Sequence, residues 1–189
     1  DAARSHFGFL KELGFTEKRA EPTYLRLEKG DAFVEVFHGR ASFELGLEFG
    51  RRVRVDDDDV EQKFHLVDVV PVLAPDITFT ARSATTKAQV ARFVEELADT
   101  TKPVAERLEQ GGGDAFDRIS EAVAARSEEY LDGLRATRLR SRADDAWQRK
   151  DFASVVAAYE EVESELKTVD LRESEAKRLN YVRRQIDEA

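Results

Sequence analysis

Residues 32–49, AFVEVFHGRASFELGLEF, decide the class of fold that we expect. The run before the His-Gly-Arg segment at 38–40 is apolar apart from Glu35, and apolar and polar side chains alternate strictly in the run after it. Such alternation predicts two antiparallel strands with one buried and one wet face, joined by a glycine-containing turn. The wet face of the second strand carries Glu44, Gly46 and Glu48. Its apolar face is formed by Phe43, Leu45, Leu47 and Phe49.

The preceding residues extend this sheet toward the N-terminus. A run at 24–27 ends at Glu28-Lys29-Gly30-Asp31, which is typical of a turn and predicts a further strand. Before it, Phe7, Leu10 and Leu13 have helical spacing, and Gly14 follows them as a helix-ending residue. Residues 1–82 therefore predict one helix covering the apolar face of an antiparallel meander.

The residues after the meander are dominated by charge. Arg51, Arg52 and Arg54 precede four aspartates at 56–59, and we expect a solvated turn there. The aspartates lack the alternate spacing and the glycine of a calcium loop. The three histidines are about 30 residues apart, and the chain has no cysteine, so we expect no metal site and no cofactor. The apolar patch 64–73 predicts a short helix or covering segment.

Near residue 82 the period of the apolar residues changes from strand-like to helical. The sequence thus predicts an α+β protein with a sheet module at 1–82 and an all-α module at 83–189. Two apolar seams lie on either side of Gly111–Gly113, which predicts a helical hairpin over about 86–149. The first seam is Val90, Val94, Leu97, Thr101, Val104 and Leu108; the second is Phe116, Ile119, Val123, Arg126, Tyr130 and Leu134. Pro103 predicts a kink or a new helix start.

Residues 139–189 resemble a single tetratricopeptide-type helical hairpin. The resemblance rests on small residues at Ala143 and Ala146, on Trp147 before the turn, and on Phe152 and Tyr159 after it. It implies a pair of closely packed helices with a partner-binding surface. The segment lacks a second copy at a 34-residue period and the closing proline of that family, which favours a structural hairpin.

The candidate partner-binding residues lie in this module. They are Trp147, Phe152, Tyr159, Arg135 and Arg138. The two arginines belong to a basic run that ends at Arg142, and Asp144 and Asp145 follow as counter-charges. Because the chain carries a net charge of −9, we do not expect nucleic acid as a partner.

The N-terminal sequence carries a second, weaker resemblance. Phe7-Gly8-Phe9-Leu10 and Leu13-Gly14-Phe15, followed by a meander, are similar to small bacterial proteins of unassigned activity, some associated with toxin–immunity or defence loci. The resemblance implies a bacterial accessory or inhibitor protein, and the net charge of −9 makes it an acidic one. No apolar run is long enough to span a bilayer, so we expect no membrane partner and a cytoplasmic location.

Three hypotheses of function follow. The first is a non-catalytic protein-binding protein, in its sharpest form an immunity-type inhibitor of a basic partner. The second is a scaffold that forms homo-oligomers through residues 86–134. The third is an enzyme that uses Asp31, Glu35 and Glu44, with Glu35 and Glu44 on the wet face of the meander. Because no catalytic or cofactor motif is present, we favour the first.

Overall fold

The computed structural model describes residues 2–39 and 42–187 and has the expected α+β architecture. Its contacts divide the chain into two compact units, residues 1–122 and 123–189. This division differs from the boundary at residue 82 suggested by the change of period. Arg40, in the predicted second turn, lies outside the described residues.

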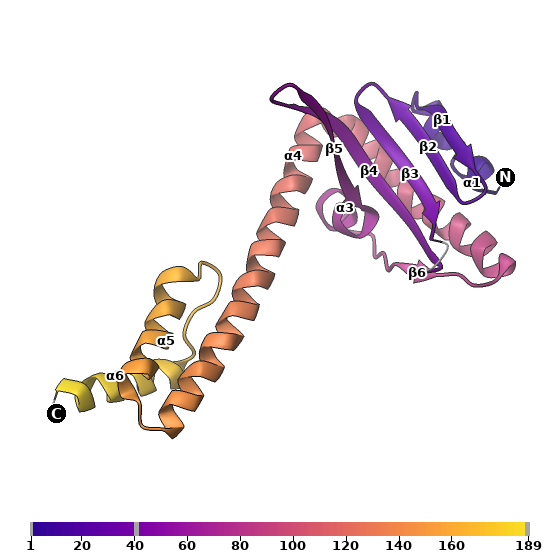
Figure 1. Ribbon diagram of the computed structural model, residues 1–189. Helices are drawn as coiled ribbons and strands as arrows, with labels where there is room; N and C mark the ends of the chain where they lie inside the picture. The colour runs from indigo at the N-terminus through magenta and orange to yellow at the C-terminus, as the bar shows by residue number, and fades with distance from the viewer. Residues whose placement is uncertain (1, 40–41, 188–189) are drawn as a thin grey trace. The chain divides into compact units, whose positions relative to one another are not determined.

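The first unit is built on an antiparallel sheet of consecutive neighbours, β1-β2-β3-β4-β5, with β6 paired to β4 (Figure 1). The strands are β1 (Thr16–Glu21), β2 (Tyr24–Lys29), β3 (Ala32–His38), β4 (Glu44–Val55), β5 (Asp58–His65) and β6 (Arg82–Ser83). The register places Leu25, Val36 and Leu47 in one row across three strands. All three are buried, as the alternation predicted.

The sheet is larger than the sequence suggested. Strand β1 was not predicted, and the charged block at 51–59 belongs to the β4–β5 hairpin, in which only Asp56 and Asp57 make the turn. Cross-strand pairing of Arg54 with Asp59 places opposite charges side by side on one face of this hairpin, and Val53 pairs with Val60 on the other. Phe43 is also not part of the apolar face: it is 45% exposed and adopts a positive φ of 55°.

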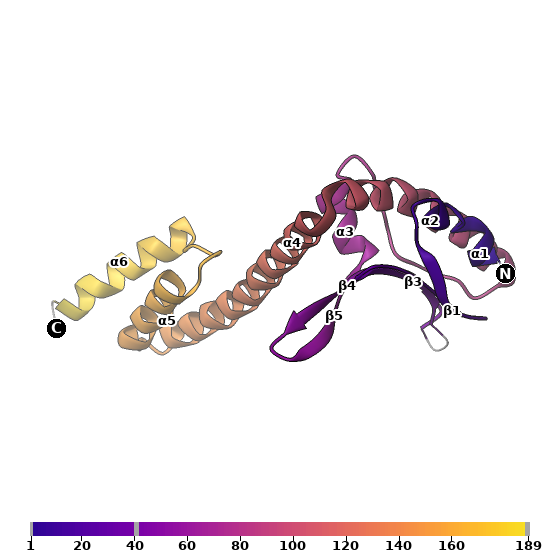
Figure 2. The same cartoon turned by 90° about the horizontal axis from the view of Figure 1, so that it is seen from above.

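Helices cover one face of this sheet (Figure 2). The two short helices α1 (Ala2–His6) and α2 (Phe9–Glu12) replace the single helix that was predicted, and Gly14 follows them at φ 89°. The predicted short helix is present as α3 (Leu66–Leu73). Much of the remaining cover comes from the first part of α4 (Lys87–Gln148), and this packing explains why the first unit extends beyond residue 82.

Several contacts fix α4 to the sheet. Phe116 packs against Phe64 of β5 at 6.3 Å between ring centroids, and Gln62 donates a hydrogen bond to Ser120 at 3.1 Å. The buried α4 side chains of this unit include those of Phe93, Leu97 and Leu108. The first predicted seam therefore packs onto a sheet and not onto a second helix.

The glycine triplet does not form the loop of an antiparallel hairpin. Helical residues continue through Gly111 and Gly113, and only Gly112 leaves helical geometry, at φ 54° and ψ −137°. Glycine tolerates this conformation because it has no Cβ. Pro103 lies inside the helix without such a break. The structure thus differs from the predicted hairpin over 86–149: two helical segments of α4 meet at a kink at Gly112.

The second unit contains the end of α4, α5 (Phe152–Glu165) and α6 (Glu173–Asp187). The turn after α4 uses Lys150 at φ 57°, and the Asp151 side chain caps α5 by accepting a hydrogen bond from the Ser154 amide at 3.2 Å. The core joins all three helices through Ala143, Ala146, Val155, Ala158, Tyr159, Leu179 and Val182. The small residues at Ala143 and Ala146 are fully buried, which permits close helix packing.

Candidate functional site

A polar network occupies the face of the sheet that is opposite the apolar row. Its centre is Glu35 on β3, which is only 3% exposed. The Glu35 carboxylate accepts hydrogen bonds from the Tyr24 hydroxyl at 2.5 Å, from Arg26 at 2.6 Å and from Lys63 at 2.8 Å. The guanidinium of Arg26 also lies 4.0 Å from the centre of the Phe33 ring.

These neighbours keep Glu35 ionised. Burial raises the pKa of Glu35, but the hydrogen bonds from Lys63, Tyr24 and Arg26 outweigh it and leave the pKa below its ordinary value. Arg26 also lowers the pKa of Glu61. Glu35 is therefore the counter-ion of a cationic cluster. A general acid or base works best with a pKa near the working pH, and the lowered pKa of Glu35 is displaced away from that range.

The carboxylates of the enzyme hypothesis are not gathered into one site. Glu35 pairs across the strands with Glu48, whose side chain contacts His65 at 3.3 Å. Glu44 is on the same strand as Glu48 but four residues away, about 13 Å along the strand. Asp31 lies in the turn between β2 and β3. The structure thus places Glu35 and Glu44 on one face without bringing them together.

The aspartates at 56–59 are exposed around the β4–β5 turn. Within the described residues, no group of three or more histidines, aspartates or glutamates has the geometry to hold a metal ion. His38 lies 2.9 Å from the carbonyl oxygen of Ala84, and His65 contacts Glu48, so both have local partners.

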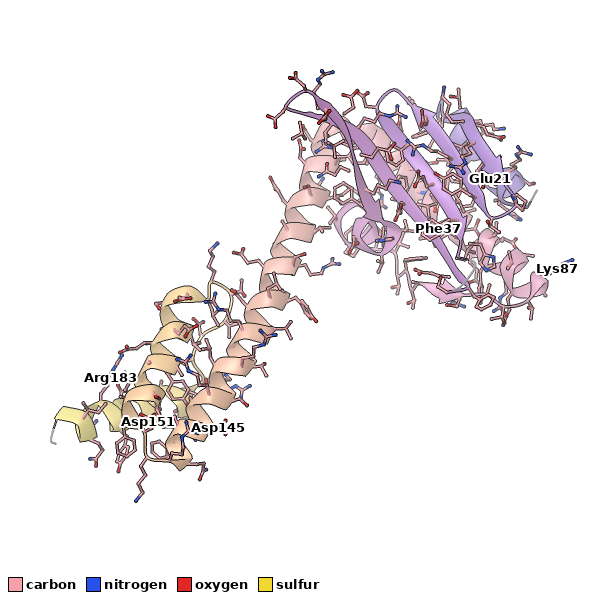
Figure 3. All side chains as sticks on the ribbon, in the orientation of Figure 1. Glu21, Phe37, Lys87, Asp145, Asp151 and Arg183 are labelled. Carbon is pink, nitrogen blue, oxygen red and sulfur yellow. The ribbon has the colours of Figure 1, made fainter. Side chains whose placement is uncertain are left out.

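The first unit also contains a cleft of about 740 Å³, which we call the α1–α4 cleft. It lies at the end of the sheet, between α1, the β1–β2 turn and the first turns of α4. Its apolar lining includes Ala3, Leu25, Val36, Leu45, Val90 and Val94. Figure 3 labels Glu21, Phe37 and Lys87, which line it from three different segments. No local sequence pattern predicts this cleft, because its lining residues are scattered over about 90 positions.

The aromatic residues predicted to bind a partner lie in the second unit (Figure 3, around Asp151). Tyr159 is 1% exposed and accepts a hydrogen bond from Arg178 at 3.1 Å, so it packs the core and does not face a partner. Trp147 and Phe152 are half-buried against each other, with ring centroids 6.0 Å apart. Tyr181, half exposed, packs against the same tryptophan with ring centroids 5.9 Å apart and the ring planes tilted by 59°.

The predicted arginines differ in their surroundings. Arg135 forms ion pairs with Glu165 and, at 3.6 Å, with Glu161. Arg138 is exposed on α4. The neighbouring Arg140 contacts Glu175 at 2.8 Å. Carboxylates of the same unit thus neutralise part of the basic run, which reduces its attraction for phosphate.

Next to Arg138, α4 exposes three large apolar side chains. Tyr130, Leu131 and Leu134 are 67%, 62% and 43% exposed, and we call them the α4 stripe. Other α4 side chains of the same segment, Glu128 and Asp132, bond to Lys167 in the α5–α6 loop. Tyr130 and Leu134 were expected to continue a packed seam; helical spacing identified the seam but not which part of it is covered.

Comparisons with known proteins give no match: no family model, no curated protein and no solved structure is similar to this chain. None of the described helices has the length and apolar character that crossing a bilayer requires. The functional assignment therefore depends on the residues and surfaces described above.

Proposed function

We propose that this chain is a non-catalytic binding protein whose partner is another protein, and that the α4 stripe contacts that partner. The observation that supports the proposal is the exposure of Tyr130, Leu131 and Leu134 within about one turn of helix. Water contact with that much apolar surface is unfavourable, and a partner would relieve it.

The chemistry of the stripe suits recognition by a protein surface. Tyrosine is among the residues that contribute most to binding energy at protein interfaces. Leu131, Leu134 and Arg138 are spaced as i, i+3 and i+7, the pattern by which one helix presents anchors to a hydrophobic groove. Arg138 supplies an exposed charge beside the apolar anchors.

The finer form of the proposal is an acidic inhibitor of a basic protein. The net charge of −9 and the exposed aspartates 56–59 of the β4–β5 hairpin favour a basic partner. Charge of this kind accelerates association, so the rate of binding should fall as salt is added. Under this form the acidic surface guides the encounter, and the stripe supplies the short-range contacts.

Self-association is the alternative that one observation favours. Most apolar residues of the first predicted seam are buried in the first unit and cannot contact a second copy. Leu131, Leu134 and Arg138 are exposed and have the spacing that would pack against a helix of a second copy. Of the predicted oligomer interface at residues 86–134, only the α4 stripe and the residues next to it are therefore proposed to contact a second copy. Both hypotheses use the same side chains but differ in the occupant.

Sedimentation velocity and affinity capture on the full chain test these proposals together. The double variant L131S/L134S removes two apolar anchors, and V55S/V60S removes two exposed valines from the β4–β5 hairpin as the matched control. We expect to capture a protein that binds the wild type and the control variant equally, with a Kd near or below about 1 μM. Its affinity for L131S/L134S should be at least about tenfold weaker.

If the wild type forms a concentration-dependent dimer that L131S/L134S abolishes, the partner of the stripe is a second copy of this chain and not another protein. A wild-type chain that stays monomeric and captures no protein at micromolar affinity would overturn the proposed function. An equal loss of affinity in both double variants would show that the stripe is not the binding surface, because any exposed apolar group would then have the same effect.

A further inference from the structure

The α1–α4 cleft has the size and lining of a small-molecule site. Its volume of about 740 Å³ falls within the range typical of ligand pockets, roughly 300–1,000 Å³. Leu25, Val36 and Leu45 come from the apolar face of the sheet, and Val90 and Val94 come from α4. A ligand entering it would therefore place an apolar group against aliphatic side chains.

Most polar groups at the rim of the cleft already have partners. Arg4 is paired with Glu17 at 2.6 Å, and Glu21 with Arg19 at 2.6 Å. His38 lies 2.9 Å from the carbonyl oxygen of Ala84. The Tyr24 hydroxyl donates to Glu35 on the other face of the sheet. These groups would have to break existing contacts to bind a ligand.

Lys87 is the exception among these rim charges. It is exposed, and it has no ion pair or side-chain hydrogen bond with the described residues. An ammonium beside an apolar cleft, with no counter-ion within residues 2–39 and 42–187, complements a ligand that has one anionic group and an apolar body. Because lysine carries a compact charge with three donors, it can reach a carboxylate without a fixed approach direction.

We propose that the α1–α4 cleft binds a small monocarboxylic acid, with its apolar chain or ring in the cleft and its carboxylate at Lys87. The proposal goes beyond the protein-binding function and does not depend on it, since the α4 stripe belongs to the other unit. The aliphatic residues determine where the apolar body binds, and the charge of Lys87 selects an acid over a neutral or cationic analogue.

Titration of the ¹⁵N-labelled full chain with octanoate, 1-octanol and octylamine tests this assignment by NMR. Octanoate should give saturable amide shifts at Leu25, Val36, Leu45 and Val90. Charge reversal in K87E should weaken octanoate binding about fivefold, as expected for loss of an exposed ion pair. The affinity for 1-octanol should change by less than about 1.5-fold, since that ligand carries no charge.

Two further variants make the test specific. Lys102 is also exposed, and it lies on the same helix about 22 Å along the axis from Lys87, so K102E should leave octanoate binding unchanged. V90W should prevent octanoate and 1-octanol from binding, because it fills the cleft; its NMR spectrum reports whether the variant is folded.

Three results would overturn the assignment. The first is an absence of saturable shifts at millimolar octanoate. The second is a set of shifts located away from the cleft. The third is equal weakening of octanoate and 1-octanol by K87E, which would show that Lys87 does not recognise the carboxylate.

Discussion

Replacing Glu35 by alanine should destabilise the first unit, because Glu35 is the buried acceptor of its polar network. Arg26 keeps its bonds to Glu28 at 2.7 Å and to Glu61 at 2.6 Å. Lys63, whose side chain is 38% exposed, can still be solvated, and it keeps its ion pair with Glu61 at 3.5 Å. The loss should therefore lie at the lower end of the range for a broken buried ion pair, about 3 kcal/mol.

Glu48→Ala provides the matched control. Glu48 pairs directly with Glu35 across β3 and β4, and its side chain lies 3.3 Å from the exposed His65. Its removal should cost less than about 1 kcal/mol. The free energy of unfolding is measured by urea titration with circular dichroism, and hydrogen exchange of β3 amides locates the change. A loss for Glu35→Ala within about 1 kcal/mol of the control would refute the reasoning.

The same network predicts a pH dependence with a definite sign. The pKa of Glu35 is lowered by Lys63, Tyr24 and Arg26 despite burial, and Arg52 and Arg26 lower that of Glu28. A lowered pKa in the folded state contributes stability that is fully present above the ordinary glutamate value, about 4.3. That contribution is lost as the pH falls through the lowered values. Glu35→Ala should therefore flatten the acid side of the stability curve.

Four substitutions test local features of the fold. Gly50→Ala should cost about 1–3 kcal/mol, because its Cβ would lie 2.2 Å from an atom of the buried Phe33 ring; thermal unfolding measures the loss, and a change below about 0.5 kcal/mol would contradict the packing. Gly112→Ala should cost about 1–3 kcal/mol of stability because of its φ of 54°. Gly113→Ala, whose Cβ meets no atom, should be neutral or stabilising. The reverse order of the two variants in thermal unfolding would contradict a kink at Gly112. Asp151→Ala should cost about 1 kcal/mol through loss of the α5 cap, measured by Trp fluorescence because Trp147 is the only tryptophan; an unchanged midpoint would count against the cap.

The sequence predicted those elements whose local pattern and packing agree. The apolar run around Glu35 identified β3, strict alternation identified the first half of β4, and the apolar patch identified α3. The β4–β5 hairpin was not predicted because most of its residues are charged. Its strands are joined by cross-strand pairs such as Arg54 with Asp59 and Val53 with Val60. Pairing between strands is a non-local property that a run of like charges does not reveal.

Helical spacing gave the apolar faces of α4 but not what covers them. Val94 and Leu97 have the spacing of a helix–helix seam, yet they are buried in the sheet-bearing unit. Farther along α4, Leu131 and Leu134 have equivalent spacing and are exposed. Periodicity measures only amphipathicity, so the same pattern predicted both a packed face and an open one.

The candidate sites differed in the same way. Tyr159 was singled out for its aromatic ring, but its ring fills the core of the second unit. The α1–α4 cleft depends on α1, the β1–β2 turn and α4 meeting in space, and no short motif encodes that meeting. Lys87 is significant only because the neighbouring rim charges are already paired.

Site-specific photo-crosslinking tests the central claim, partner binding by the α4 stripe, most directly. A photoreactive phenylalanine analogue replaces Leu131, which is 62% exposed, or the control residue Val55, which is 51% exposed, in cells that express the chain. The account predicts a discrete protein adduct from position 131 and none from position 55. No adduct at position 131, or the same adducts from both positions, would contradict it.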